Sequence, residues 1–146
     1  MSKIHREALL PYSNEMIYHL VNDVPRYSEF LPWCHATEIV EQTEVLMRAS
    51  IFVKKMGVSK TFSTENILEP NQKITMSLLN GPFKHLKGEW QFVSIQTLGC
   101  KVILDLDFEF LPGLMNLPFK KVFEPAADSM LQSFVTRAHA LYGDKK

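Results

Sequence analysis

The stretch LMNLPFKKVFEPAADSMLQSFVTRAHALY, residues 114 to 142, decides the fold of this chain. Its apolar side chains recur every three or four residues, which is the spacing of an amphipathic helix. They are Phe119, Phe123, Ala126, Met130, Phe134, Ala138 and Leu141. Gly143 follows them and is a typical residue just beyond a helix end. The spacing predicts a long helix with one apolar face.

Two prolines lie in this predicted helix. Pro118 fits the first turn, where its missing amide is no loss. Pro125 lies further along, where a proline removes a hydrogen bond of the helix. We expect either a kink at Pro125 or a short separate helix before a main helix that begins near Glu124.

Most of the chain before this helix has the alternation of β-strands. In LDLDFEF, residues 104 to 110, leucine and phenylalanine take one face while the acidic residues take the other. Similar segments predict about seven antiparallel strands, with a turn at Asn80-Gly81-Pro82. Gly88 lies within one of them, where we expect a bend or a bulge.

The amino-terminal part predicts a strand followed by two short helices. Pro11 ends the strand, and Ser13 is a good N-cap for the first helix. VPRYSEFLPWC, residues 24 to 34, has the spacing of a second short helical piece. The expected fold class is therefore α+β, with a curved antiparallel sheet around the long carboxyl-terminal helix. We expect one domain over residues 1–146.

The composition limits the classes of partner. Sixteen basic and sixteen acidic side chains give a formal net charge of +0, so no global field attracts DNA. The chain has neither an apolar run long enough to span a membrane nor the apolar run of a signal peptide. Cys34 and Cys100 are far apart, which predicts two buried free thiols in a reducing cytoplasm.

No motif predicts catalysis or metal binding. Asp105, Asp107 and Glu109 share a strand face that is opposite the apolar one, so we expect them to face water. The five histidines lack the spacing of metal ligands. Cys34 and His35 are adjacent and would diverge on a strand, so we expect no thiolate–imidazole pair.

A sheet wrapped around a single helix leaves an apolar hollow unless large side chains fill it. Ligand pockets are mostly apolar, and so is a solid core, so the pattern leaves both interpretations open. The candidate ligand-binding residues are Phe30, Leu31, Trp33, Phe62, Met76, Trp90, Phe92, Phe108, Met130 and Phe134.

Basic residues form three local groups. They are Lys54, Lys55 and Lys60; Lys84, His85 and Lys87; and Lys120 and Lys121. Solvated lysines are the ordinary interpretation. If several lysines meet at one rim of the sheet, they can contact phosphates.

The order of these elements resembles the START or helix-grip superfamily, which includes Bet v 1-like proteins. More narrowly, the sequence resembles the bacterial ribosome-association toxin family, close to the coenzyme Q-binding START proteins. The resemblance lies in ALLPYSNEMIYHLVNDVPRYSEFLPWC (8 to 34), GVSKTFSTEN (57 to 66), NGPFKHLKGEWQF (80 to 92), LDFEF (106 to 110) and MLQSFVTRAHALY (130 to 142). Residues 111 to 125, with three prolines, depart from a plain continuous helix.

The resemblance implies a cavity for a long apolar ligand such as a polyprenyl quinone, with ubiquinone as the example and no required cofactor. It also implies binding to the large ribosomal subunit that blocks its joining with the small one. The candidate ribosome contacts are Lys54, Lys55, Lys84, Lys87, Lys120 and Lys121. Membership of a toxin family implies a cognate antitoxin, and the expected location is the cytoplasm of a bacterium. No catalytic residues are carried over, because the family has no established reaction. Some helix-grip relatives are polyketide cyclases or dehydratases, so an enzyme acting on an apolar substrate in the same cavity is the alternative. Such chemistry needs ionisable groups inside, and the inward positions are almost all apolar.

Overall fold

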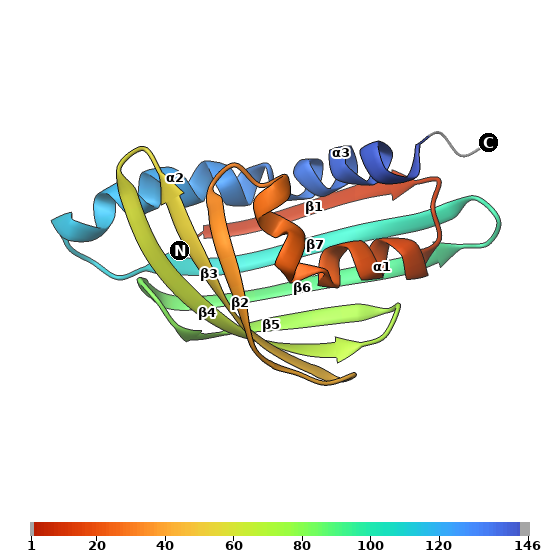
Figure 1. Ribbon diagram of the computed structural model, residues 1–146. Coiled ribbons are helices and arrows are strands. Elements are labelled where there is room, and N and C mark those ends of the chain that lie inside the picture. The colour runs from red at the N-terminus through yellow and green to blue at the C-terminus, as the bar shows by residue number, and fades with distance from the viewer. Residues whose placement is uncertain (1, 144–146) are drawn as a thin grey trace.

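The computed structural model describes residues 2–143, in which seven antiparallel strands form one sheet in the order β1-β7-β6-β5-β4-β3-β2. The strands are β1 (Ser2–Leu10), β2 (Cys34–Gln42), β3 (Leu46–Lys55), β4 (Val58–Glu69), β5 (Lys73–Asn80), β6 (Phe83–Ile95) and β7 (Gly99–Phe110). The sheet curves around the helices, as Figure 1 shows. The predicted α+β helix-grip architecture is confirmed.

Strands β1 and β2 lie at opposite edges of the sheet, so the chain between them must cross it. It crosses with helix α1 (Asn14–Asn22), which packs on β6 and β7, and the 3-10 helix η1 (Val24–Glu29), which packs on β2. Ser13 is the N-cap of α1, as predicted, and its Oγ accepts a hydrogen bond from the amide of Met16 at 3.1 Å. This crossing covers one end of the concave face (Figure 1).

The prediction of one helical piece over residues 24 to 34 was too long. Pro25 lies in the first turn of η1, and the helix ends at Glu29 because Phe30 leaves helical geometry with φ −139° and ψ −8°. Cys34 is already the first residue of β2. Phe30, Leu31 and Trp33 therefore belong to an irregular segment that packs on the core.

The carboxyl-terminal helix is two helices. After the short η2 (Leu114–Asn116), α2 (Leu117–Asp128) and α3 (Met130–Tyr142) follow one another along the sheet (Figure 1). The prediction that a main helix begins near Glu124 was wrong. Helix α2 continues through Pro125, and the break between the two helices falls at Ser129. There the Ser129 amide and Oγ both donate to the Pro125 carbonyl, at 3.1 and 3.0 Å. A serine side chain that bonds the backbone in this way competes with the helix.

Gly88 lies in a continuous stretch of sheet, so the expected bulge was wrong. It pairs in register with Met76 on β5 and Leu106 on β7. A Cβ at this position would lie 2.4 Å from Met76 Cε and 2.9 Å from Leu106 Cδ2. Gly88 is therefore required for space, because the Met76 side chain lies across it.

Two groups of aromatic rings attach the helices to the sheet. The first, named the α2 cluster, consists of Phe62, Phe83, Phe108, Phe110, Phe119 and Phe123, with ring centroids as close as 4.9 Å between Phe83 and Phe123. The second, named the α3 cluster, consists of Tyr27, Phe30, Trp90, Phe92 and Phe134. Edge-on ring pairs of this kind add to the stability that burial alone provides.

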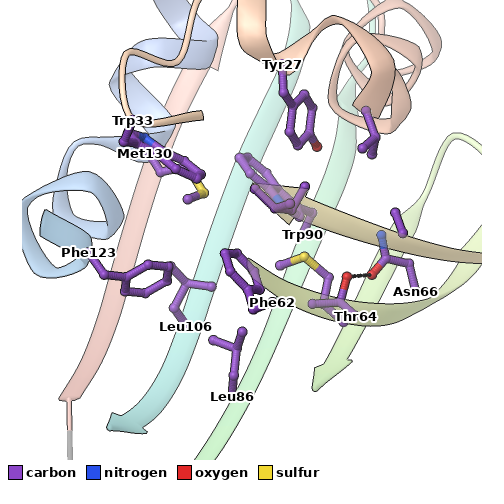
Figure 2. Close-up of a pocket in the computed structure, with 14 residues that line it drawn as sticks. Tyr27, Trp33, Phe62, Thr64, Asn66, Leu86, Trp90, Leu106, Phe123 and Met130 are labelled. Carbon is purple, nitrogen blue, oxygen red and sulfur yellow. Dashed lines mark hydrogen bonds between the residues drawn. The ribbon is translucent and has the colours of Figure 1, made fainter. Parts of the chain in front are cut away.

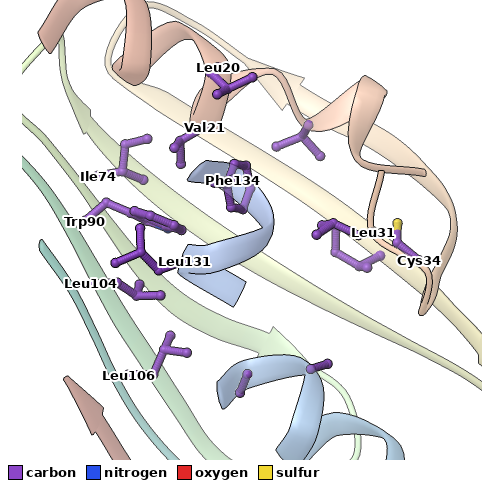
Figure 3. Packing of buried hydrophobic residues seen from close by; sticks show 14 of the residues in the cluster. Leu20, Val21, Leu31, Cys34, Ile74, Trp90, Leu104, Leu106, Leu131 and Phe134 are labelled. Carbon is purple, nitrogen blue, oxygen red and sulfur yellow. The ribbon is translucent and has the colours of Figure 1, made fainter. Parts of the chain in front are cut away.

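Phe134 is the central ring of the α3 cluster. Its centroid lies 5.1 Å from those of both Trp90 and Phe30. Figure 3 shows Leu131 and Phe134 on α3 facing Trp90 and Leu104 of the sheet. Within residues 2–143, no helix has both the length and the apolar character that crossing a bilayer requires.

Candidate functional site

An apolar cavity of about 70 Å³ lies between the two aromatic clusters. Its walls come from η1, the segment before β2, five strands and both terminal helices (Figure 2). The lining residues are Val24, Tyr27, Trp33, Ala49, Ile51, Phe62, Thr64, Asn66, Met76, Leu86, Trp90, Leu106, Phe123 and Met130. An apolar cavity that binds benzene measures roughly 150 Å³. The present cavity is smaller than that, so it takes a ring only when side chains move.

The movable walls are Met76 and Met130, which are both partly buried. Methionine is unbranched and adapts its shape to what it packs against. Met130 is the first residue of α3, directly after the break at Ser129. These two side chains are therefore the most adaptable part of the cavity wall.

Five of the ten predicted ligand-binding residues line the cavity: Trp33, Phe62, Met76, Trp90 and Met130. The other five, Phe30, Leu31, Phe92, Phe108 and Phe134, pack behind its walls and do not line it. Phe108 contacts Phe123 in the α2 cluster, and Phe92 stacks parallel to Trp90. Their burial comes from packing, because large rings fill the space on either side of the cavity.

Two polar residues that were not among the predicted site residues, Thr64 and Asn66, lie on the inner face of β4. They are buried, with exposed fractions of 7% and 6%, and Thr64 Oγ1 donates to Asn66 Oδ1 at 3.1 Å. The two-residue alternation of a strand, counted onward from Phe62, would have placed both inside. Tyr27 and other residues of η1 were missed because their segment is not a regular α-helix.

Tyr27 is the one titratable residue among those that line the cavity within residues 2–143. Its hydroxyl donates to the Val21 carbonyl, and burial raises the pKa of Tyr27 far above its ordinary value. A phenol held in this state neither accepts nor releases a proton at neutral pH. The cavity walls therefore lack an acid–base pair.

Trp33 lines both the cavity and a surface groove of about 280 Å³. The groove also contacts Lys55 and Met56 at the turn between β3 and β4, and Lys121 on α2. Met56 is 84% exposed. Trp33 thus lies between the cavity and this groove.

The predicted ribosome-contact lysines are distributed over separate surfaces. Lys55 and Lys121 share the groove beside Trp33, and Lys54 neighbours Lys55 at the end of β3. Lys120 lines a different hollow, next to Phe110 and Leu117. Lys84 lies 3.8 Å from Glu109, and Lys87 borders the outer sheet face with Asp107. Of the six predicted lysines, the fold therefore brings together only Lys55 and Lys121 from different groups in the sequence.

The acidic residues of β7 lie on the outer face of the sheet, as predicted, and pair there with histidines and lysines. His85 Nε2 is 3.0 Å from Asp107 Oδ1, which holds the pKa of that carboxyl below its usual value. His5 lies between Asp105 and Glu7, and these hydrogen bonds raise the pKa of His5. Among residues 2–143, no group of His, Cys, Asp and Glu is arranged to hold a metal ion.

Both cysteines are buried free thiols, as predicted. Burial raises the pKa of Cys34 and of Cys100 to about 11 each. His35 is exposed, whereas Cys34 is buried and donates to the Ala36 carbonyl. The two residues diverge on β2, so they form no catalytic pair.

The curved sheet, the crossing helices and the apolar cavity define a helix-grip protein. The chain belongs to the family described as polyketide cyclase / dehydrase and lipid transport, which matches residues 10–135. The resemblance to the ribosome-association toxins is confirmed. The chain is 46% identical to the "Ribosome association toxin RatA" of Vibrio cholerae, over 99% of this chain and 100% of that protein.

Two further comparisons are with more distant proteins. The "Coenzyme Q-binding protein coq10, mitochondrial" of Schizosaccharomyces pombe is 26% identical over 89% of this chain and 82% of that protein. The crystal structure of the Zhui aromatase/cyclase from Streptomyces sp. R1128 has a TM-score of 0.79 and 18% identity, covering 94% of this chain and 93% of that one. At this identity the second likeness shows the fold alone.

Proposed function

We propose that this chain is a non-enzymatic helix-grip protein whose cavity receives an apolar ligand such as a polyprenyl quinone. The observation that carries the proposal is the chemistry of the cavity walls, which are apolar except for Tyr27, Thr64 and Asn66. Apolar pockets with few polar groups are typical of small-molecule sites. The name of the relative from Schizosaccharomyces pombe, a coenzyme Q-binding protein, supports the choice of ligand.

The alternative, a polyketide cyclase-like enzyme, is weakened by the same walls. General acid–base catalysis needs an ionisable group within reach of the substrate. Tyr27 is the only titratable residue of the described lining, and its hydroxyl is held by Val21. A cavity of this kind stores or presents a ligand and does not transform it.

The ligand proposal is tested with intrinsic fluorescence, because both tryptophans of the chain, Trp33 and Trp90, line the cavity. Titration with a short-chain ubiquinone should quench them saturably at micromolar concentration. Trp33→Phe and Trp90→Phe assign the quenching to each ring, and free N-acetyltryptophanamide corrects for absorption by the quinone. Quenching that follows the free tryptophan curve contradicts ligand binding.

We also propose that the protein associates with the large ribosomal subunit and blocks subunit joining. The support is the 46% identity to a protein named as a ribosome association toxin, together with Lys55 and Lys121 on one groove. Neither lysine forms an ion pair with any residue of the described chain, so both charges are available to phosphates. The proposal places the protein in the cytoplasm and keeps a cognate antitoxin as a partner.

Co-sedimentation tests the second proposal. The protein should sediment with purified large subunits at low salt, and raised salt should release it. The double variant Lys55→Glu/Lys121→Glu should lose sedimentation, whereas Lys84→Glu/Lys87→Glu is the comparison, since Lys84 already faces Glu109. Absence of the wild-type protein from the pellet even at low salt contradicts the proposal.

A further inference from the structure

The inner face of β4 carries a polar pair in an otherwise apolar space. Phe62 and Leu68 point inward with Thr64 and Asn66 between them. A buried amide costs free energy unless its donors and acceptor are paired. By comparison, the buried hydroxyls of Ser50 on β3 and Ser63 on β4 pair with each other, with their Oγ atoms 2.7 Å apart. The Thr64–Asn66 pair is different, because the amide hydrogens of Asn66 have no acceptor in it.

The hydrogen bonds of Asn66 can be counted. Its Oδ1 accepts from Thr64 Oγ1 at 3.1 Å. Its Nδ2 donates to no residue of the part of the chain that the structure describes. The side chain is more than nine-tenths buried and lines the cavity, so its unpaired donor lies at the cavity wall. Figure 2 shows the pair at the opposite end of the cavity from Phe123.

The amide group is held in place before any ligand arrives. The Thr64 hydroxyl fixes the oxygen side of the Asn66 amide, which turns the nitrogen side away from Thr64. The backbone of Asn66 is paired in register with Met47 on β3 and Met76 on β5. A donor fixed by its neighbours in this way binds an acceptor without the entropy cost of ordering a free side chain.

We propose that Asn66 Nδ2 is the docking point for a carbonyl oxygen of the ligand. The inference rests on the proposed function, since it requires that the cavity takes an apolar ligand. The described lining has no Lys, Arg or His, so a carboxylate or phosphate would be buried without a countercharge. The fitting class is a neutral ketone, quinone or ester on an apolar body.

The neighbours of Asn66 fit such a ligand. Met76 is the cross-strand partner of Asn66, and its Cε lies over Gly88. Movement of this flexible thioether makes room beside the amide for the ring or chain that carries the carbonyl. Trp90 and Phe62 also line the cavity and are drawn near the pair in Figure 2, so they offer apolar surface for the body of the ligand.

A matched pair of probes tests the inference. Menadione, a methylnaphthoquinone, carries two carbonyl oxygens, whereas dimethylnaphthalene has a similar shape and none. Both are titrated into the wild-type protein and into Asn66→Leu, with protein-observed NMR as the readout. We expect the variant to bind menadione about threefold to tenfold more weakly, the effect of losing one neutral hydrogen bond, and dimethylnaphthalene unchanged.

A direct readout and a second variant complete the test. In the wild-type protein, the side-chain NH₂ signals that are missing from the Asn66→Leu spectrum should shift with menadione and stay in place with dimethylnaphthalene. Thr64→Val/Asn66→Leu replaces both partners by apolar groups of similar shape, which preserves the fold. Its thermal unfolding verifies this, and it should show the same selective loss.

The outcomes separate the two proposals. Equal weakening of both probes, or an unshifted Asn66 signal with bound menadione, overturns the carbonyl site and leaves ligand binding standing. Failure of the wild-type protein to bind either probe overturns both.

Discussion

Arg137 on α3 reaches Glu29 at the end of η1, with its Nη2 2.7 Å from Glu29 Oε1. The guanidinium also lies over the ring of Phe30, 5.0 Å from the ring centroid. The Arg137 side chain is only 17% exposed, whereas that of Glu29 is 46% exposed, so solvent still screens the pair from one side. Through these contacts a single side chain connects the last helix to the segment that covers the cavity.

Replacing Arg137 by methionine should therefore lower the free energy of unfolding by about 1 kcal/mol, the sum of a modest ion pair and a cation–π contact. Chemical denaturation measures this change. Arg26→Met is the comparison, because Arg26 pairs with both Glu29 and Asp23 but is 62% exposed, so its replacement should have the smaller effect. An effect of Arg137→Met no larger than that of Arg26→Met would contradict the prediction.

Gly88→Ala should reduce the space for a ligand. The new Cβ would meet Met76 Cε and Leu106 Cδ2 and push both towards the cavity that they line. Overpacking of this kind costs about 1–3 kcal/mol of folding stability. Because the displaced side chains would occupy space that a ligand needs, the affinity for short-chain ubiquinone should fall as well. Tryptophan quenching measures the affinity.

Gly57→Ala is the matched control for Gly88→Ala. Gly57 has a φ of +80°, so alanine there strains the turn, but nothing lies within 4 Å of the added Cβ. It should lower stability while leaving the ligand affinity unchanged. A loss of affinity in this control, equal to that of Gly88→Ala, would mean that stability alone decides binding.

The two thiols should react slowly in the folded protein. With pKa values near 11 instead of 9.0, Cys34 and Cys100 hold about a hundredfold less thiolate at neutral pH, and burial excludes the reagent as well. Reaction with Ellman's reagent should be slow under native conditions. Two equivalents should react at once in guanidinium chloride. Rapid reaction of one thiol in the folded state would show that its strand opens.

The outer face should contribute a pH-dependent stability through His5. The hydrogen bonds from His5 to Asp105 and then to Glu7 raise its pKa above 6.5 in the folded state. The contribution is therefore fully present below pH 6.5 and is lost as the pH rises through the folded pKa. NMR titration of the His5 ring measures that pKa.

Two variants assign the cause of the His5 shift. Asp105→Asn should lower the pKa of His5 more than Glu7→Gln does, because the hydrogen bond to Asp105 is the larger cause. The pKa of Glu7 is lowered by His5 and then by Lys101, so its contribution is present above pH 4.5 and is lost as the pH falls. A His5 pKa that neither variant changes would contradict this assignment.

The strands could be predicted because each exposes one face and buries the other. The alternation in LDLDFEF places Leu104 and Leu106 in the core and Asp105 outside, and the structure agrees. The break in the terminal helix was misplaced because Pro125 is visible in the sequence, whereas the hydrogen bonds of Ser129 to the Pro125 carbonyl depend on the fold. Gly88 was misjudged for a similar reason, since its cause is a methionine on another strand.

The site was predictable only in part. Periodicity identifies buried side chains, but it does not say whether a buried ring borders a cavity or fills the space behind it. Trp90 and Phe134 have the same signal in the sequence, and only the first lines the cavity. Thr64 and Asn66 were missed because polar residues were assigned to the outer face, although their positions relative to Phe62 place them inside.

The cavity between the two aromatic clusters has a consequence for how members of this family can diverge. The rings that attach α2 and α3 to the sheet form the clusters, whereas the movable walls of the cavity are Met76 and Met130. Residue exchanges at these two positions would change the size of the cavity and leave the ring contacts of the helices in place. The interior of this fold can therefore vary independently of its outer surface.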